Sequence, residues 1–204
     1  MNQKLTIAFM AGVFSLAMAA SANISGSAHD FQAAGWNTGA GTNQTCVVCH
    51  TPHAAKSDTF GPLWNHDTNT TSYTTYDTLG NATYQGGAAS LGPESLACLS
   101  CHDGTVALDA YGSHSPSATK MTGAALVGSG GDLTTEHPIG FAYDNTLYLA
   151  DGGLNDPSTL SDVKLFNDKL ECASCHDVHD MAGNGKLLRI DNSGSALCTE
   201  CHNK

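Results

Sequence analysis

The sequence is short of positive charge. Its 204 residues include 8 Lys and Arg against 19 Asp and Glu, which gives a formal net charge of −11 at pH 7. A chain with so few cations is not expected to bind nucleic acid through phosphate contacts, and an anionic membrane surface would repel it. The acidic surface predicts a solvated protein that attracts cations, including oxidised metals.

Long apolar runs are also scarce, and the one extended run lies at the N-terminus. Lys4 precedes the run from Leu5 to Leu16, and small residues at Ala20 to Ala22 follow it. This is the pattern of a secretory signal peptide. The run is short for a membrane span, and no basic stop-transfer residues follow it. We therefore expect a signal peptide at residues 1–22, export, no stable membrane span, and a single domain at residues 23–204.

No cysteine is left outside one repeated motif. Cys-x-x-Cys-His occurs four times, at residues 46–50, 98–102, 172–176 and 198–202. This spacing is typical of c-type haem attachment, in which two thiols add to the porphyrin vinyl groups and the histidine binds the iron. Disulfides or zinc sites would not require a histidine after every second cysteine. The sequence predicts four haem c groups, with thioethers at Cys46, Cys49, Cys98, Cys101, Cys172, Cys175, Cys198 and Cys201 and proximal ligands His50, His102, His176 and His202.

Methionine is too rare to supply the second ligand of four haem irons. Only Met121 and Met181 lie beyond the expected signal peptide, whereas ten histidines are present in the chain. Four proximal histidines leave six others for four distal positions. We therefore predict two histidines on every iron, which lowers the reduction potential relative to His/Met ligation. A saturated iron has no position for a substrate, so electron transfer is favoured over catalysis and we expect the protein not to be an enzyme.

The contexts of the six spare histidines differ. His53 and His179 each lie three residues after a proximal histidine, and positions three apart share one face of a helical turn. Each is therefore better placed for a neighbouring haem than for its own. His137 precedes a proline in an apolar segment, which suits a ligand. His114, between two serines, is typical of a solvated surface histidine. The remaining candidates are His29, near the start of the mature chain, and His66, a reserve distal ligand.

The rest of the composition predicts little regular structure. The chain has 22 glycines, and Ser, Thr and Asn are frequent, so a side-chain core would be thin. We predict a mostly coil fold with a few short helices and minimal strand, in which the haems form the core. The expected elements are a helix from Pro93 to about Tyr111, a last helix at Ser195 to Cys201, a short strand at Lys186 to Ile190, and a strand pair or loop at Thr68 to Tyr84.

The haem motifs and the segments between them carry a resemblance. The segments are His29-Asp30-Phe31, Pro62-Leu63-Trp64-Asn65-His66, His137-Pro138-Ile139 and the terminal Cys201-His202-Asn203-Lys204. In this order they resemble the multihaem outer-surface c-type cytochromes of metal-reducing bacteria, and with four haems the chain is most similar to the OmcE type. The resemblance covers nearly the whole mature chain.

The resemblance implies a subunit of an extracellular filament with a continuous chain of haems, which passes electrons to metal oxides or other external acceptors. It implies distal roles for His29, His53, His137 and His179, head-to-tail assembly of identical subunits, and redox partner cytochromes. One haem would take a histidine from the next subunit, with His29 or His66 as the candidate. The alternatives are a soluble periplasmic electron carrier and a multihaem reductase of small oxyanions, which would need one open iron.

Overall fold

The computed structural model describes residues 23–33, 44–57, 59–114 and 116–203. Within them the chain is mostly coil, with isolated bridges in place of strands. The predicted fold of coil with a few short helices is therefore confirmed, and the predicted signal peptide at residues 1–22 lies outside the described residues. The α-helices are α1 (Pro93–His102), α2 (Asn145–Asp151), α3 (Cys172–Cys175) and α4 (Ala196–Cys201). The 3-10 helices are η1 (Thr45–Val48), η2 (Tyr76–Leu79), η3 (Gly123–Ala125), η4 (Ser129–Gly131), η5 (Pro157–Thr159), η6 (Gly185–Leu187) and η7 (Ser193–Ser195).

Helix α1 is shorter than the sequence predicted. It begins at a proline, which suits the first turn, and it ends at His102 instead of continuing to Tyr111. Asp103 turns its carboxylate to the backbone N–H of Thr105 at 2.8 Å, and Gly104 adopts a φ of 72°. A helix commonly ends where a side chain accepts a hydrogen bond from the backbone two residues further on and a glycine in left-handed conformation follows, and Asp103 and Gly104 provide both features.

The structure also decides the two segments in which strands were expected. The strand expected at Lys186 to Ile190 is wrong, because Gly185–Leu187 forms η6 and Lys186 and Leu187 have φ angles of 58° and 57°. Such left-handed backbone cannot continue a strand. In the segment from Thr68 to Tyr84 the loop alternative holds, with η2 and a single bridge from Thr74. The expected last helix is present as α4.

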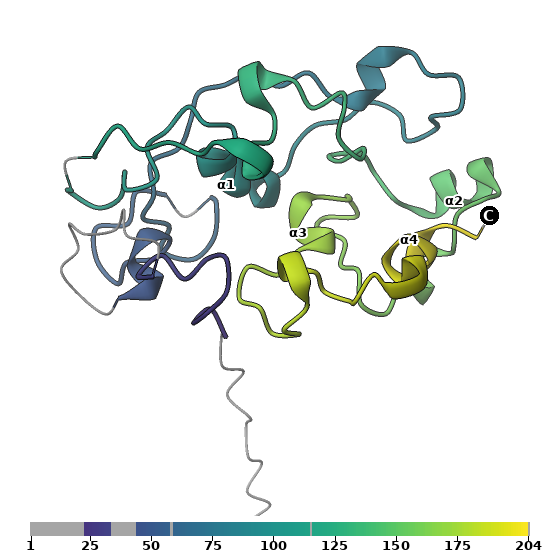
Figure 1. Cartoon of the computed structure of the whole chain (residues 1–204). Coiled ribbons are helices and arrows are strands. Elements are labelled where there is room, and N and C mark those ends of the chain that lie inside the picture. Colours follow the sequence, from purple (N-terminus) through teal and green to yellow (C-terminus); the bar gives the residue numbers. More distant parts are fainter. Residues whose placement is uncertain (1–22, 34–43, 58, 115, 204) are drawn as a thin grey trace, which may run out of the picture.

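Buried apolar side chains occur in both halves of the chain, for example at Val48 and Leu99, and an apolar cluster lies in the C-terminal half. This cluster joins the buried side chains of Phe141, Tyr143, Leu147, Leu154, Val163 and Leu170. Helices α1, α3 and α4 follow one another from left to right across the view, while the first haem motif on η1 lies at the lower left (Figure 1). Among the described residues, none of the helices has the length and hydropathy needed to cross a bilayer.

Candidate functional site

Each Cys-x-x-Cys-His motif lies on or at the end of a short helix. The second, third and fourth motifs lie on α1, α3 and α4, and the cysteines of the first lie at η1. Helices α3 and α4 end at the second cysteine of their motifs, and His176 and His202 then leave in extended conformation, with φ, ψ of −105°, 140° and −100°, 132°. All eight cysteines are free thiols, so every motif has both sulfurs available for thioether bonds.

Three of the four proximal histidines are oriented by backbone carbonyl groups. The Nδ1 of His50 lies 2.8 Å from the carbonyl oxygen of Pro62, and that of His102 lies 2.7 Å from the carbonyl oxygen of Ala125. The Nδ1 of His176 lies 3.0 Å from the carbonyl oxygen of Lys186. Metal-binding histidines commonly donate their second ring N–H in this way, which fixes the tautomer and directs Nε2 at the metal.

Two of these carbonyl groups lie in strained backbone. Leu63, directly after Pro62, has a φ of 57°, and Lys186 has a φ of 58°. Residues with a Cβ rarely adopt this region, and such strain is found where the surrounding structure demands a particular geometry. In both places the left-handed turn accompanies a carbonyl that faces a proximal histidine. The sequence alone offered no signal for these partners, because each lies 10 or more residues away along the chain.

Three of the spare histidines lie opposite proximal histidines. The ring centroids of His29 and His102 are 6.1 Å apart, and those of His50 and His179 are 6.3 Å apart with nearly parallel planes. His137 and His202 are 6.4 Å apart. The pairs join residues from distant parts of the chain, so the fold itself creates the spacing.

This spacing matches the separation of two imidazoles on one metal ion. A metal–imidazole bond is about 2.0–2.1 Å long. The centre of a five-membered ring with bonds near 1.33 Å lies roughly 1.1 Å behind the nitrogen. Two imidazoles on opposite sides of one iron therefore have centroids about 6.2–6.4 Å apart. The residues present thus fit a haem iron at three of the four motifs.

Two of the paired distal candidates are held in the neutral form that binds a metal. Burial, together with the neighbouring His102, His176 and His179, lowers the pKa of His29 to about 4, and a backbone hydrogen bond at Val178 only partly opposes them. Burial also lowers the pKa of His137, and His202 acts in the same direction, while a hydrogen bond to a backbone carbonyl opposes them. A neutral imidazole has a free nitrogen lone pair, so these environments favour coordination.

The third motif differs from the other three. Within the described part of the chain, the ring of His176 is paired with no other ring, and neither is that of His53, which is exposed. The expected helical turn between a proximal histidine and the histidine three residues on is wrong for both motifs. After His50 the chain forms bends, and after His176 it is extended before a turn at Asp177 to Asp180. His179 nevertheless reaches a neighbouring motif, that of His50.

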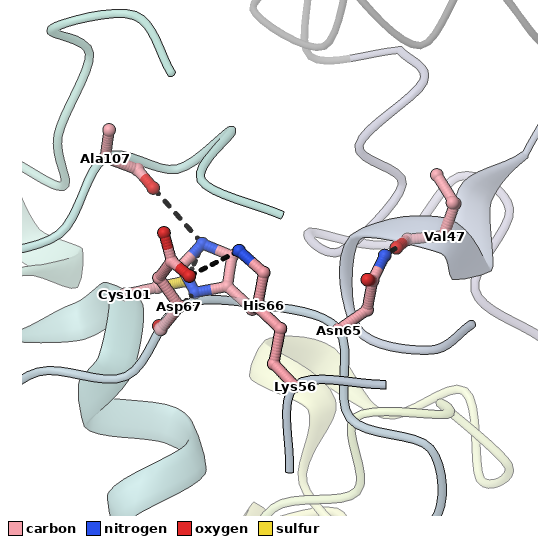
Figure 2. Close-up of polar contacts among 7 residues, drawn as sticks. All are labelled: Val47, Lys56, Asn65, His66, Asp67, Cys101 and Ala107. Carbon is pink, nitrogen blue, oxygen red and sulfur yellow. Dashed lines mark hydrogen bonds and ion pairs between the residues drawn. The ribbon is translucent and has the colours of Figure 1, made fainter. Parts of the chain in front are cut away.

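His66, the reserve candidate, lies between the first two motifs with both ring nitrogens engaged. It is 1% exposed, and its Nδ1 and Nε2 lie 2.7 and 3.1 Å from the carbonyl oxygens of Asp67 and Ala107. The sulfur of Cys101 lies 3.5 Å from Nε2 (Figure 2). Burial lowers the pKa of His66, so the ring is neutral and only one of its nitrogens can donate a proton to a carbonyl oxygen. The other nitrogen is also closed in by a carbonyl oxygen, and this geometry favours a packing role for His66 beside the second motif.

A cavity of about 790 Å³ adjoins His179. Its wall includes Lys164 and Arg189, two of the few basic residues of the chain. Arg189 donates Nε–H to the carbonyl oxygen of Ala173 at 2.8 Å, which holds its guanidinium beside the third motif. Cofactor pockets typically measure about 300–1,000 Å³, so the cavity is large enough for a macrocycle. Asp162 and Asp177 also lie in its wall, so the two basic residues there are balanced by two acidic ones.

Neighbouring motifs are joined by polar contacts. Asn65 donates its backbone N–H to the carbonyl oxygen of Cys49 in the first motif at 2.9 Å, and His66 packs on Cys101 of the second motif. The thiols of Cys98 and Cys172 interact with each other where α1 packs against α3. Near the fourth motif, Glu200 accepts hydrogen bonds from the segment that begins at Ser161.

The comparison with known protein families agrees with this chemistry. A family model described as a doubled CXXCH motif matches residues 164–204, which contain the third and fourth motifs. No curated protein matches the chain closely enough to count as a relative. The motifs and this match indicate covalently bound haem c and the haem-binding electron transfer of a multihaem c-type cytochrome.

Proposed function

We propose that this multihaem cytochrome carries electrons through four haem c groups, each ligated by two histidines. The supporting observation is the spacing of 6.1–6.4 Å between the rings of His29 and His102, His50 and His179, and His137 and His202. When bound, the haem iron takes up or releases one electron between its ferric and ferrous states. With two histidines on each iron, no position would be left for a substrate, so the protein would act as an electron carrier and not as an enzyme.

The third motif needs a ligand from elsewhere, and we assign it to His53 of a neighbouring copy of the chain. His53 is exposed and, in the described residues, makes no ring contact, and the same is true of the ring of His176. The earlier bridging candidates are less suitable. His29 lies beside His102, and both nitrogens of His66 face carbonyl oxygens. A ligand donated between copies would join them head to tail.

Such a head-to-tail contact would build a filament. We therefore propose an exported chain that assembles at the cell surface and conducts electrons to external acceptors such as metal oxides. The acidic composition agrees with a surface that attracts oxidised metal cations. A soluble periplasmic carrier remains the alternative, since it needs the same haems and no assembly.

The ligand assignment is tested by removing one distal histidine at a time from the haem-loaded protein. His179→Ala should convert one of four low-spin irons into a high-spin iron that binds cyanide, as measured by electron paramagnetic resonance and visible absorption. His114→Ala is the matched control, because His114 lies against Asp109 and Tyr111, away from the proximal rings. Four unchanged low-spin irons in His179→Ala would overturn the pairing of His179 with His50.

The filament is tested by electron microscopy of native protein together with cell fractionation. Wild type and His114→Ala should form filaments, and His53→Ala should give monomers in which one iron is high-spin. Monodisperse wild-type monomers with a periplasmic location would overturn the filament in favour of the carrier. Filaments that persist in His53→Ala would exclude His53 as the bridging ligand.

A further inference from the structure

A buried carboxylate lies between the second and third haem motifs. Glu171 immediately precedes Cys172 and is 1% exposed. Its Oε1 accepts the backbone N–H of Gly92 at 2.9 Å, and its Oε2 accepts the hydroxyl of Ser95. Gly92 and Ser95 belong to the start of α1, the helix that carries the second motif. One carboxylate thus binds the N-terminal end of the neighbouring haem-bearing helix.

Backbone groups at the start of α3 add two more hydrogen bonds to the contact between α1 and α3. Glu171 donates its backbone N–H to the hydroxyl of Ser174 at 2.8 Å, and Cys172 donates its backbone N–H to the hydroxyl of Ser95 at 2.9 Å. Ser95 and Ser174 are both 0% exposed. A buried network in which every member has partners fixes geometry more firmly than packing alone. It holds α1 and α3 in one relative position.

The first cysteines of the two motifs meet beside this network. The thiols of Cys98 and Cys172 interact with each other, and Cys172 directly follows Glu171. The macrocycles attached to these sulfurs must therefore approach one another near the carboxylate. A negative charge in a buried setting acts over several ångströms with little screening, so its field reaches both attachment sites.

We propose that Glu171 is a positioning residue for electron transfer, which clamps α1 to α3 and, when ionised, lowers the reduction potentials of the haems on the second and third motifs. The inference rests on the proposed function. The ferric state carries one more positive charge than the ferrous state, so a nearby carboxylate stabilises the ferric state and makes reduction harder.

The protonation of Glu171 determines when this charge is present. Burial raises its pKa and Glu94, on α1, acts in the same direction, whereas the hydrogen bonds from Ser95 and Gly92 and the charge of Lys169 oppose them. The net result is a pKa above the usual value for a glutamate. The other titratable neighbours, the thiols of Cys98 and Cys172, lose their protons permanently when thioethers form.

The test is Glu171→Gln in the haem-loaded protein, which keeps the shape of the side chain and removes the charge. The four reduction potentials are followed by redox titration between about pH 4 and 9, a range that spans a raised glutamate pKa. At high pH two of the four potentials should be higher in the variant, and the other two should be unchanged. At low pH the difference should disappear, because Glu171 is then neutral in the wild type.

Asp191→Asn is the control, because it removes one negative charge from an exposed residue, where solvent screens the field. Equal shifts of all four potentials in Glu171→Gln, no shift, or a difference that persists at low pH would overturn the inference. Haem content and the low-spin spectrum are recorded first. Missing haem or high-spin iron in the wild type contradicts the proposed function, whereas an intact spectrum with unmoved potentials contradicts only the role of Glu171.

A second variant keeps the inference testable if Glu171→Gln fails to incorporate haem. Ser95→Ala leaves the carboxylate in place and removes a hydrogen bond that favours its ionised form. The pKa of Glu171 should then rise, and the pH at which the two potentials fall should move upward. An unchanged pH dependence in Ser95→Ala would contradict the assignment to Glu171.

Discussion

Asp103, the residue directly after the proximal histidine of the second motif, binds a distant loop to α1. It is 3% exposed. Its Oδ2 accepts hydrogen bonds from Asn69, Thr71 and Tyr73 at 2.9, 3.0 and 2.7 Å, and its Oδ1 accepts the backbone N–H and hydroxyl of Thr105 at 2.8 Å each. Burial alone would raise its pKa, but the bonds from Thr105, Tyr73 and Thr71 outweigh burial and hold the pKa below its usual value.

Asp103→Asn should destabilise the folded protein strongly. An amide nitrogen placed at either oxygen position would face donors instead of accepting from them, so at least two hydrogen bonds are lost. A hydrogen bond to a charged group contributes about 1.5–3 kcal/mol, so we expect a loss of roughly 3–5 kcal/mol in the free energy of unfolding. Urea unfolding of the haem-loaded protein, followed by circular dichroism, measures this loss.

Asp132→Asn is the matched control. Asp132 accepts the N–H and hydroxyl of Thr134 at 2.8 and 2.7 Å, as Asp103 does from Thr105, but it is exposed. Its replacement should change stability little. Similar losses in the two variants, or a loss below 1 kcal/mol in Asp103→Asn on the about 1.5–3 kcal/mol scale per charged bond, would refute the reasoning.

The pH dependence gives an independent check with a defined sign. The pKa of Asp103 is lower in the folded than in the unfolded protein, where it is about 3.9. Its contribution is therefore complete above that value and is lost as the pH falls through the folded pKa. The gap in stability between wild type and Asp103→Asn should stay constant from neutral pH down to about pH 4 and narrow below it.

Two backbone predictions follow. Lys186→Gly should stabilise the protein by about 1 kcal/mol in urea unfolding, because φ is 58° at Lys186 and glycine adopts this region without strain. Gly183→Ala should lower the stability instead, because φ is 67° at Gly183 and alanine would be strained there. Gly92→Ala should be destabilising, because a Cβ there would lie 2.7 Å from Oε1 of Glu171, whereas Gly185→Ala, with open space around it, should be nearly neutral. Equal thermal midpoints for Gly92→Ala and Gly185→Ala would contradict the close approach.

The sequence predicted the local features of this molecule well and the distant ones poorly. The motifs are read directly from residue spacing, and the coil-rich fold follows from composition. The end of α1 was missed because it depends on the side chain of Asp103 and a left-handed Gly104, a combination that outweighs the helical pattern beyond it. The helical turns expected after His50 and His176 are also absent, because the chain there is held by hydrogen bonds to remote loops such as that of Lys186.

Pairings between histidines could not be derived from spacing. His29 and His102 are separated by most of the first half of the chain, and His50 and His179 by more than half of its length. Coil segments have no fixed rise per residue, so their end positions depend on every turn between them. Within the described residues the ring of His176 has no partner ring, whereas His29 lies beside His102. In the filament that we propose, this favours His53 over His29 as the link between copies.

The contacts between motifs indicate the path along which electrons would pass from one haem to the next. Asn65 and His66 join the first motif to the second. Ser95 and Glu171 join the second motif to the third. Ser161 donates to Glu200 of the fourth motif, and the same segment reaches α3 through the backbone N–H of Lys164. Each haem attachment site is thus fixed to the next one along the sequence, in the order seen across Figure 1. Because a junction between copies at His176 and His53 would join the third motif of one chain to the first-motif segment of the next, the fourth motif would lie beside this path. We therefore expect loss of His202 to leave conduction along a filament largely intact, and loss of His102 to interrupt it, as conductance measurements on filaments of the two alanine variants would test.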